Sequence, residues 1–362
     1  MDLKPPPYVL SVKPYLPGKP IEELEREYGL THTIKLASNE NPLGPSPRAL
    51  EAIGRCLGRL NRYPDGSGYY LVRKLSQKFR VKPANIVLGS GSDDIIGMLT
   101  RALLYPGDEV IMPQPSFAMY DIMTRISNAC PVYVPLQSLA IDLDAIVAAV
   151  TDKTRMIFLT NPHNPTGTAF SSARFAAFLA EIPENVVIVL DEAYVEFVRD
   201  EACADSLDFL DDNRPLVALR TFSKIYGLAG LRVGYGFMPS EMVGLMNRVR
   251  QPFNVSSIAQ AAAIAALDDD AFLEQTRRVV HEGLDFLSAA LTRMGIPSFP
   301  TQANFFLLDV GRDAEAVFKA FLKEGVIVRS MSSYGYATYL RVNAGLPEEN
   351  ARFIEVLEKV MS

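Results

Sequence analysis

Several short apolar runs in this 362-residue sequence end next to polar residues suited to chemistry. Three of the runs are followed, in chain order, by Asn164, Asp191 and Lys224. A fourth leads into Gly89-Ser90-Gly91-Ser92-Asp93, a loop whose backbone N–H groups suit an anion when a helix follows. Open α/β sheets bind ligands at the carboxyl ends of their strands. If the runs are strands, an amide, a carboxylate, a lysine and an anion-binding loop meet at one rim.

This set of groups matches the needs of pyridoxal 5′-phosphate (PLP). A lysine amine forms a Schiff base with the PLP aldehyde, and a carboxylate keeps the ring nitrogen protonated so that the ring accepts electrons. The phosphate needs backbone N–H groups at a helix N-terminus, hydroxyls and an arginine. We therefore expect Lys224 to carry PLP and Asp191 to pair with the ring nitrogen.

The apolar runs have the length and composition of buried strands. They occur at 86–88, 109–112, 156–159, 186–190 and 216–219. Amphipathic helices are predicted between them, and one starts at Ser46-Pro47, where serine caps the helix and proline suits its first turn. This alternation predicts an α/β domain over residues 33–247, with a mostly parallel sheet covered by helices.

The two ends of the chain differ from this middle region. Residues 1–32 form an arm in which six prolines, from Pro5 to Pro20, are expected to prevent helix, and a short helix follows at Ile21–Tyr28. Residues 248–362 contain a mixture of predicted helices and strands, at 259–267, 273–294, 304–308, 326–329 and 339–342. We expect this second region to form a smaller α+β domain.

The composition argues against several classes of function. The net charge is −6 without a block of like charges, which disfavours a nucleic-acid or anionic-membrane surface. No apolar run is long enough to cross a bilayer, and the proline-rich N-terminus is unlike a signal peptide. The three cysteines are scattered, as expected for reduced thiols in a cytoplasmic protein. The three histidines show no ligand spacing, so we expect no metal site.

Three motifs, in their order and spacing, resemble the fold-type I PLP enzymes. They are Asn161-Pro-His-Asn164-Pro-Thr-Gly167, Asp191-Glu-Ala-Tyr194, and Ser223-Lys224 followed by Arg232. Further segments, at 11–20, 36–47, 62–65 and 334–350, are similar to the histidinol-phosphate aminotransferase family. The resemblance spans nearly the whole chain and implies a large PLP-binding domain with a smaller C-terminal domain.

The resemblance implies a role for each matching residue. Lys224 is then the Schiff-base lysine and proton carrier, with Asp191 and Tyr194 as its catalytic partners. The residues implied for PLP binding are Gly91, Ser92, Asp93, Phe117, Asn164, Asp191, Tyr194, Thr221, Ser223, Lys224, Arg232 and Tyr63. Tyr63 would reach the partner's PLP phosphate across a homodimer interface. Phe117 would stack on the ring, where the family often has tyrosine.

Small anionic substrates are implied as partners of the chain. The residues that the resemblance assigns to them are Tyr15, Asn41, Arg329 and Arg341. An arginine fork takes carboxylate or phosphate, and an unpaired charge on an apolar strand is costly. Simpler interpretations stay open, because Tyr63 and Tyr194 suit packing and both arginines suit a buried acid.

The implied reaction is transamination, in L-histidine biosynthesis. L-Glutamate gives its amino group to imidazole-acetol phosphate, and 2-oxoglutarate and histidinol phosphate are formed. Two related alternatives are an aromatic amino acid aminotransferase and a PLP decarboxylase acting on threonine phosphate. A non-catalytic PLP-binding regulator is disfavoured, because residues 1–32 are too short and insufficiently basic for a DNA-binding domain.

Overall fold

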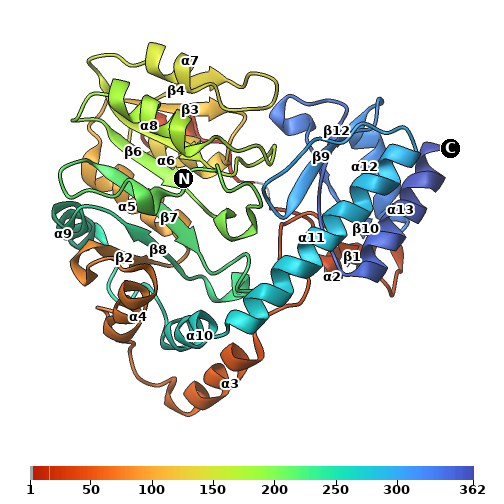
Figure 1. The fold of residues 1–362 in the computed structure, drawn as a ribbon, viewed down its shortest axis with the longest axis horizontal. Helices are drawn as coiled ribbons and strands as arrows, with labels where there is room; N and C mark the ends of the chain where they lie inside the picture. The colour runs from red at the N-terminus through yellow and green to blue at the C-terminus, as the bar shows by residue number, and fades with distance from the viewer. Residues whose placement is uncertain (1–2, 16) are drawn as a thin grey trace.

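A seven-stranded sheet forms the centre of the larger part of the molecule (Figure 1). The computed structural model describes residues 3–15 and 17–362. The strands of this sheet are β2 (Ile86–Gly89), β3 (Glu109–Gln114), β4 (Cys130–Pro135), β5 (Thr154–Thr160), β6 (Val187–Asp191), β7 (Leu216–Thr221) and β8 (Gly234–Phe237). Their order is β2-β8-β7-β6-β5-β3-β4, and β8 runs antiparallel to both of its neighbours. The other pairings are parallel, as predicted.

Both faces of this sheet are covered by helices, which explains why its central strands are mostly apolar. In β6, Val187 and Val189 pack on one face, whereas Ile188 and Leu190 pack on the other. The first face lies under α5 (Ser92–Leu103), α6 (Ala118–Ile126) and α9 (Ser240–Val249). The opposite face lies under α7 (Leu143–Ala148) and α8 (Ser172–Glu181). Each side chain that leaves water in this way contributes about 1.5–3 kcal/mol.

A three-stranded antiparallel sheet forms the centre of the smaller part. Its order is β11 (Arg329–Ser330), β12 (Tyr339–Asn343) and β9 (Phe305–Asp309), and α12 (Ala314–Lys323) and α13 (Pro347–Met361) accompany it. The single strand predicted at 326–329 is divided, because β10 (Val326–Ile327) pairs instead with β1 (Ile34–Lys35). Strand β1, which precedes the larger sheet in sequence, therefore pairs with a strand of the C-terminal region.

Helices link the two parts of the molecule. The long helix α11 (Asp270–Arg293) runs from beside α10 (Ser257–Leu267) toward the smaller part (Figure 1). Helix α10 packs on α3 (Pro47–Cys56) and α4 (Tyr69–Phe79), both of which precede the sheet in sequence. The domain bounds at 1–32, 33–247 and 248–362 stay a prediction.

The proline-rich arm contains a helix that the sequence did not predict. Helix α1 (Pro7–Leu10) begins with a proline at its first position, where the missing N–H needs no partner. Helix α2 (Ile21–Tyr28) has the predicted bounds and ends in Gly29, whose φ of 67° is left-handed. Short 3₁₀ helices complete the chain: η1 (Leu57–Arg59), η2 (Pro83–Asn85), η3 (Val195–Phe197), η4 (Ser206–Asp208), η5 (Ala229–Leu231) and η6 (Ser332–Tyr334). Among the described residues, no helix is both long and apolar enough to span a bilayer.

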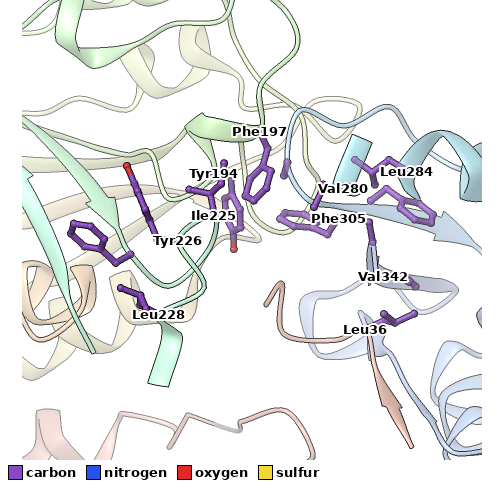
Figure 2. Packing of buried hydrophobic residues seen from close by; sticks show 14 of the residues in the cluster. Leu36, Tyr194, Phe197, Ile225, Tyr226, Leu228, Val280, Leu284, Phe305 and Val342 are labelled. Atoms are coloured by element: carbon purple, nitrogen blue, oxygen red, sulfur yellow. The ribbon is translucent and has the colours of Figure 1, made fainter. Parts of the chain in front are cut away.

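One apolar cluster joins the two parts and reaches the candidate site. Figure 2 shows Tyr194 and Ile225 of the larger part beside Phe305 and Val342 of the smaller part. The rings of Tyr194 and Phe305 meet edge to face, with centroids 5.1 Å apart. Because these side chains are all buried, the apolar contact fixes Tyr194 against the smaller sheet.

Candidate active site

A cavity of about 360 Å³ lies at the carboxyl ends of β5, β6 and β7, where the two parts meet. Its size is typical of a small-molecule site. Thirteen of the residues predicted from sequence line it: Tyr15, Ser92, Asp93, Phe117, Asn164, Asp191, Tyr194, Thr221, Ser223, Lys224, Arg232, Arg329 and Arg341. The residues predicted at the strand ends therefore line one cavity.

Asp191 is the last residue of β6 and its carboxylate is buried. Oδ2 accepts a hydrogen bond of 2.8 Å from the Tyr120 hydroxyl, and Oδ1 accepts one of 3.1 Å from the Ala193 N–H. Burial raises the pKa of Asp191 to about 6, and the two hydrogen bonds oppose this rise. The pKa of Asp191 is therefore close to neutral pH, and a cation beside the carboxylate would favour its charged form.

The amine of Lys224 faces the same cavity. Its Nζ donates a hydrogen bond of 3.0 Å to the Ser38 carbonyl oxygen and lies 5.8 Å from the centroid of the Tyr194 ring. Burial lowers the pKa of Lys224 to about 8, and the positive charge of Arg341 acts in the same direction. About a tenth of the amine is then neutral at pH 7, so it can act as a nucleophile or a base.

A chain of polar contacts runs beside this amine. The Tyr194 hydroxyl accepts a hydrogen bond of 3.0 Å from Asn39 Nδ2, and Asn164 Nδ2 lies 3.4 Å from the same oxygen. Asn164 Oδ1 accepts 2.7 Å from the Arg341 guanidinium. Burial raises the pKa of Tyr194 to about 12, so its hydroxyl keeps its proton and remains a donor. An amide and a phenol are therefore available to a ligand oxygen.

The N-terminus of α5 forms a cradle for an anion. Gly91 precedes the helix with a φ of 89°, and a side chain there would collide with Asp93 and Arg232. Arg232 Nη2 donates 2.8 Å to Asp93 Oδ1, and Nη1 lies 3.5 Å from the Ser223 hydroxyl. The backbone N–H groups, the hydroxyl and the guanidinium together suit a phosphate.

Two arginines lie side by side on neighbouring strands of the smaller sheet. Arg329 of β11 is the registered partner of Arg341 of β12, and both line the cavity. Arg341 is 8% exposed and donates 2.8 Å to the Ala37 carbonyl oxygen, and its Nε has no hydrogen-bond partner among the residues that the structure describes. Burial lowers the pKa of Arg341. A buried guanidinium with a free donor is suited to an anionic ligand.

A buried ion pair lies directly behind the strand ends. Glu192 follows Asp191, and its Oε2 accepts 2.9 Å from Nε of Arg220, which precedes Thr221. Ser206 donates to both oxygens of Glu192. Arg220 also contacts Asp205 at 2.6 Å. This pair ties the end of β6 to the end of β7 and so supports the residues that follow.

Three predicted site residues are not among those that line the cavity. Tyr63 is 83% exposed and stacks on Phe253, with centroids 4.7 Å apart. Asn41 Nδ2 donates 2.7 Å to the Ile225 carbonyl oxygen, outside the residues that line the cavity. Gly91 is next to the lining residue Ser92 and shapes the cradle through its backbone.

Sequence reasoning missed two residues that contact the predicted site. Tyr120 bonds Asp191 from helix α6, and Asn39 bonds Tyr194 from the segment after β1. Tyr120 lies within the helix that follows β3, and Asn39 precedes the larger sheet, so the pattern of polar residues directly after strand ends did not reach them. The one available signal was the position of Tyr120 three residues after Phe117, which is one turn of helix.

Comparison with known proteins identifies the family. The model of the family described as aminotransferase class I and II matches residues 31–357. Histidinol-phosphate aminotransferase 2 of Pseudomonas aeruginosa is 47% identical over 358 residues, which cover 98% of this chain and 97% of that protein. The chain belongs to the histidinol-phosphate aminotransferase family. Histidinol-phosphate aminotransferase 1 of Nitrosococcus oceani is similar to this aminotransferase at 48% identity over 353 residues, which cover 98% and 95% of the two proteins.

A solved structure agrees with this assignment. Histidinol-phosphate aminotransferase from Sinorhizobium meliloti, in complex with PLP, superimposes on the aminotransferase with a TM-score of 0.91 at 28% identity. The match covers 98% of this chain and 96% of that one. The family and the α/β fold predicted from the motifs are therefore confirmed.

Proposed function

We propose that the chain binds PLP and transfers an amino group between L-glutamate and imidazole-acetol phosphate, forming histidinol phosphate. One observation carries the proposal: Lys224, Asp191 and the paired arginines Arg329 and Arg341 line a single cavity. The amine and the carboxylate suit the cofactor, and the arginines suit an anionic substrate. The relatives of nearly full length carry the name of this activity.

The residues present fit PLP group by group. Lys224 offers a half-buried amine whose pKa is lowered to about 8, and Asp191 offers a buried carboxylate for a ring nitrogen. Asn164 and Tyr194 can hold the phenolate oxygen, and the N-terminus of α5 with Arg232 can hold the phosphate. Bound PLP supplies an electron sink for the substrate carbanion.

Two side chains carry the proton chemistry. Lys224 Nζ takes the proton from the α-carbon of the amino donor, which its lowered pKa allows near neutral pH. Asp191, once ionised, holds a proton on the facing nitrogen by charge pairing. The arginines orient the carboxylate or phosphate of the substrate, so the α-carbon stays within reach of the amine.

The activity is tested with the purified protein loaded with PLP. Histidinol phosphate and 2-oxoglutarate are mixed with it, and L-glutamate is measured; Lys224→Ala serves as the inactive control. Glutamate formed at a higher kcat/KM with histidinol phosphate than with phenylalanine supports the proposal. A preference for phenylalanine identifies an aromatic aminotransferase instead, and release of CO₂ from threonine phosphate identifies a decarboxylase.

We also propose that the chain forms a homodimer through the surface around α3 and α4. Tyr63, Tyr69 and Tyr70 are exposed there together with Leu57 and Leu60. An exposed apolar surface of this kind is typical of an interface between subunits. In such a dimer Tyr63 would complete the partner's phosphate site, as the family resemblance implies.

Hybrid dimers test the contribution of Tyr63. Lys224→Ala and Tyr63→Ala homodimers are each expected to be severely impaired. Mixing and refolding the two variants should restore activity, because one site of the hybrid has both an intact lysine and a partner's tyrosine. Sedimentation equilibrium checks the dimer itself. A monomer, or a mixture no more active than its parents, would contradict this arrangement.

A further inference from the structure

Tyr120 joins Asp191 to the neighbouring strand. The tyrosine is fully buried on α6, and its hydroxyl donates 2.8 Å to Asp191 Oδ2. The same hydroxyl lies 2.9 Å from Oγ1 of Thr160, the last residue of β5, which is paired in register with Asp191. A carboxylate only accepts hydrogen bonds. Tyr120 therefore gives its proton to Asp191, and Thr160 donates to Tyr120.

Aromatic packing fixes the direction of this hydroxyl. The Tyr120 ring stacks on Phe158 of β5, with centroids 4.6 Å apart and planes at 4°. Its other neighbour is Phe117, which it meets edge to face at 5.6 Å. Phe117 is the residue expected to stack on the cofactor ring, so one tyrosine contacts both the stacking residue and the carboxylate.

The hydrogen bond from Tyr120 affects the ionisation of Asp191, because nearby negative charges oppose it. Burial raises the pKa of Asp191, and the negative charges of Glu192 and Asp93 raise it further, whereas the Tyr120 bond lowers it. Lys224 is the cation on the cavity side, and Asp191 in turn raises the pKa of both Lys224 and Tyr194. Burial keeps the pKa of Tyr120 well above its ordinary value, so the phenol remains a donor. Removing its hydroxyl favours the neutral form of Asp191, which cannot hold a proton on a facing nitrogen.

We propose that Tyr120 is a positioning residue of the reaction, oriented by Thr160, that keeps the Asp191 carboxylate ionised and turned toward the cavity. The proposal rests on the proposed function, because it concerns the same carboxylate. It predicts that the amino-transfer rate depends on the Tyr120 hydroxyl through its hydrogen bond to Asp191.

The variant Tyr120→Phe removes one oxygen and keeps the ring stacking. We expect kcat to fall about 10- to 100-fold, as for loss of a hydrogen bond to a charged group. The acidic limb of the kcat profile should move to higher pH by about one unit, because the charged form of Asp191 loses a donor. A merely structural role would lower kcat equally at every pH and leave the limb in place.

Tyr133→Phe is the matched control. Tyr133 also donates to an aspartate of helix α6, at 2.5 Å from Asp121, outside the cavity that holds Asp191. This variant should keep the wild-type pH profile. Thr160→Val, which removes only the donor to Tyr120, should move the limb in the same direction by a smaller amount, and it tests the proposal if Tyr120→Phe fails to fold.

A second readout uses the protein without cofactor. Infrared difference spectra follow the carbonyl band of the protonated Asp191 carboxyl, which is assigned by its absence in Asp191→Asn. The titration midpoint should be higher in Tyr120→Phe than in the wild type and unchanged in Tyr133→Phe. An unmoved midpoint together with an unmoved acidic limb would overturn the proposal. Because this titration needs no turnover, it remains decisive even if the wild type fails to transaminate histidinol phosphate.

Discussion

Replacing Lys224 by methionine should stabilise the protein in its cofactor-free form. Methionine keeps the length of the side chain and removes its charge. Burial lowers the pKa of Lys224 from 10.5 in the unfolded chain to about 8. The folded protein therefore carries a protonated amine at a cost whenever the pH is below 8.

The size of this cost follows from the two pKa values. Lowering the pKa of Lys224 from 10.5 to about 8 corresponds to about 3 kcal/mol of unfolding free energy. The cost is fully present below pH 8, where both states are protonated, and it disappears above pH 10.5, where both are neutral. The lost hydrogen bond to Ser38 offsets about 1 kcal/mol. We expect a net gain of about 2 kcal/mol at pH 7.

Urea unfolding of the two cofactor-free proteins at pH 7 and pH 10 measures the effect. At pH 10 the cost in the wild type falls to about 1 kcal/mol, so the advantage of Lys224→Met should shrink by about 2 kcal/mol. Protein concentrations are matched, because a dimer's apparent stability depends on concentration. The same difference in stability at both pH values would refute the reasoning, since packing changes alone do not follow the titration of one amine.

Three further outcomes are expected at and behind the site. Asp191→Asn should leave the fold intact, as circular dichroism will check, and should reduce kcat at least 100-fold, because its amide cannot hold a proton on a facing nitrogen by charge. Arg341→Gln should raise the KM for histidinol phosphate at least 10-fold, because the guanidinium that binds the anion is lost. The urea midpoint of unfolding should stay close to that of the wild type. Arg220→Met should destabilise by about 3–5 kcal/mol by leaving Glu192 unpaired, and adding Glu192→Gln should recover part of that loss in a urea double-mutant cycle.

The strand ends of the larger sheet were predictable because their signal is local. Asn164, Asp191 and Lys224 each follow an apolar run, and parallel strands carry such residues to one rim. Strand β8 was missed, since two of its four residues are glycines, which have low strand propensity. The structure explains Gly234, where a side chain would meet the backbone N–H of Ser92 at 2.5 Å. The glycine that allows β8 to approach the start of α5 thus also lowers the strand propensity of the β8 sequence.

Contacts between distant segments were beyond reach from the sequence. Tyr120 and Asp191 are 71 residues apart, and nothing near either residue indicates the other. The strands β1 and β10 are separated by an even longer stretch of sequence. Each has only two residues, which is too short to show a periodic pattern. The proposed role of Tyr63 depends on a second subunit, so the sequence of one chain indicates it only through the family resemblance.

The pairing of β1 with β10 constrains how the enzyme matures during synthesis. The segment after β1 supplies the Ala37 carbonyl to Arg341, which is 304 residues further along, and the Ser38 carbonyl to Lys224. Domains emerging from a ribosome fold from the N-terminal side. In this chain β1 and the pocket residues that follow it are synthesised early, but β1 can pair with β10 only after the C-terminal strands have been made. A nascent chain that ends before β10 therefore has no finished pocket, and we expect the cofactor to bind only after β10 has been made.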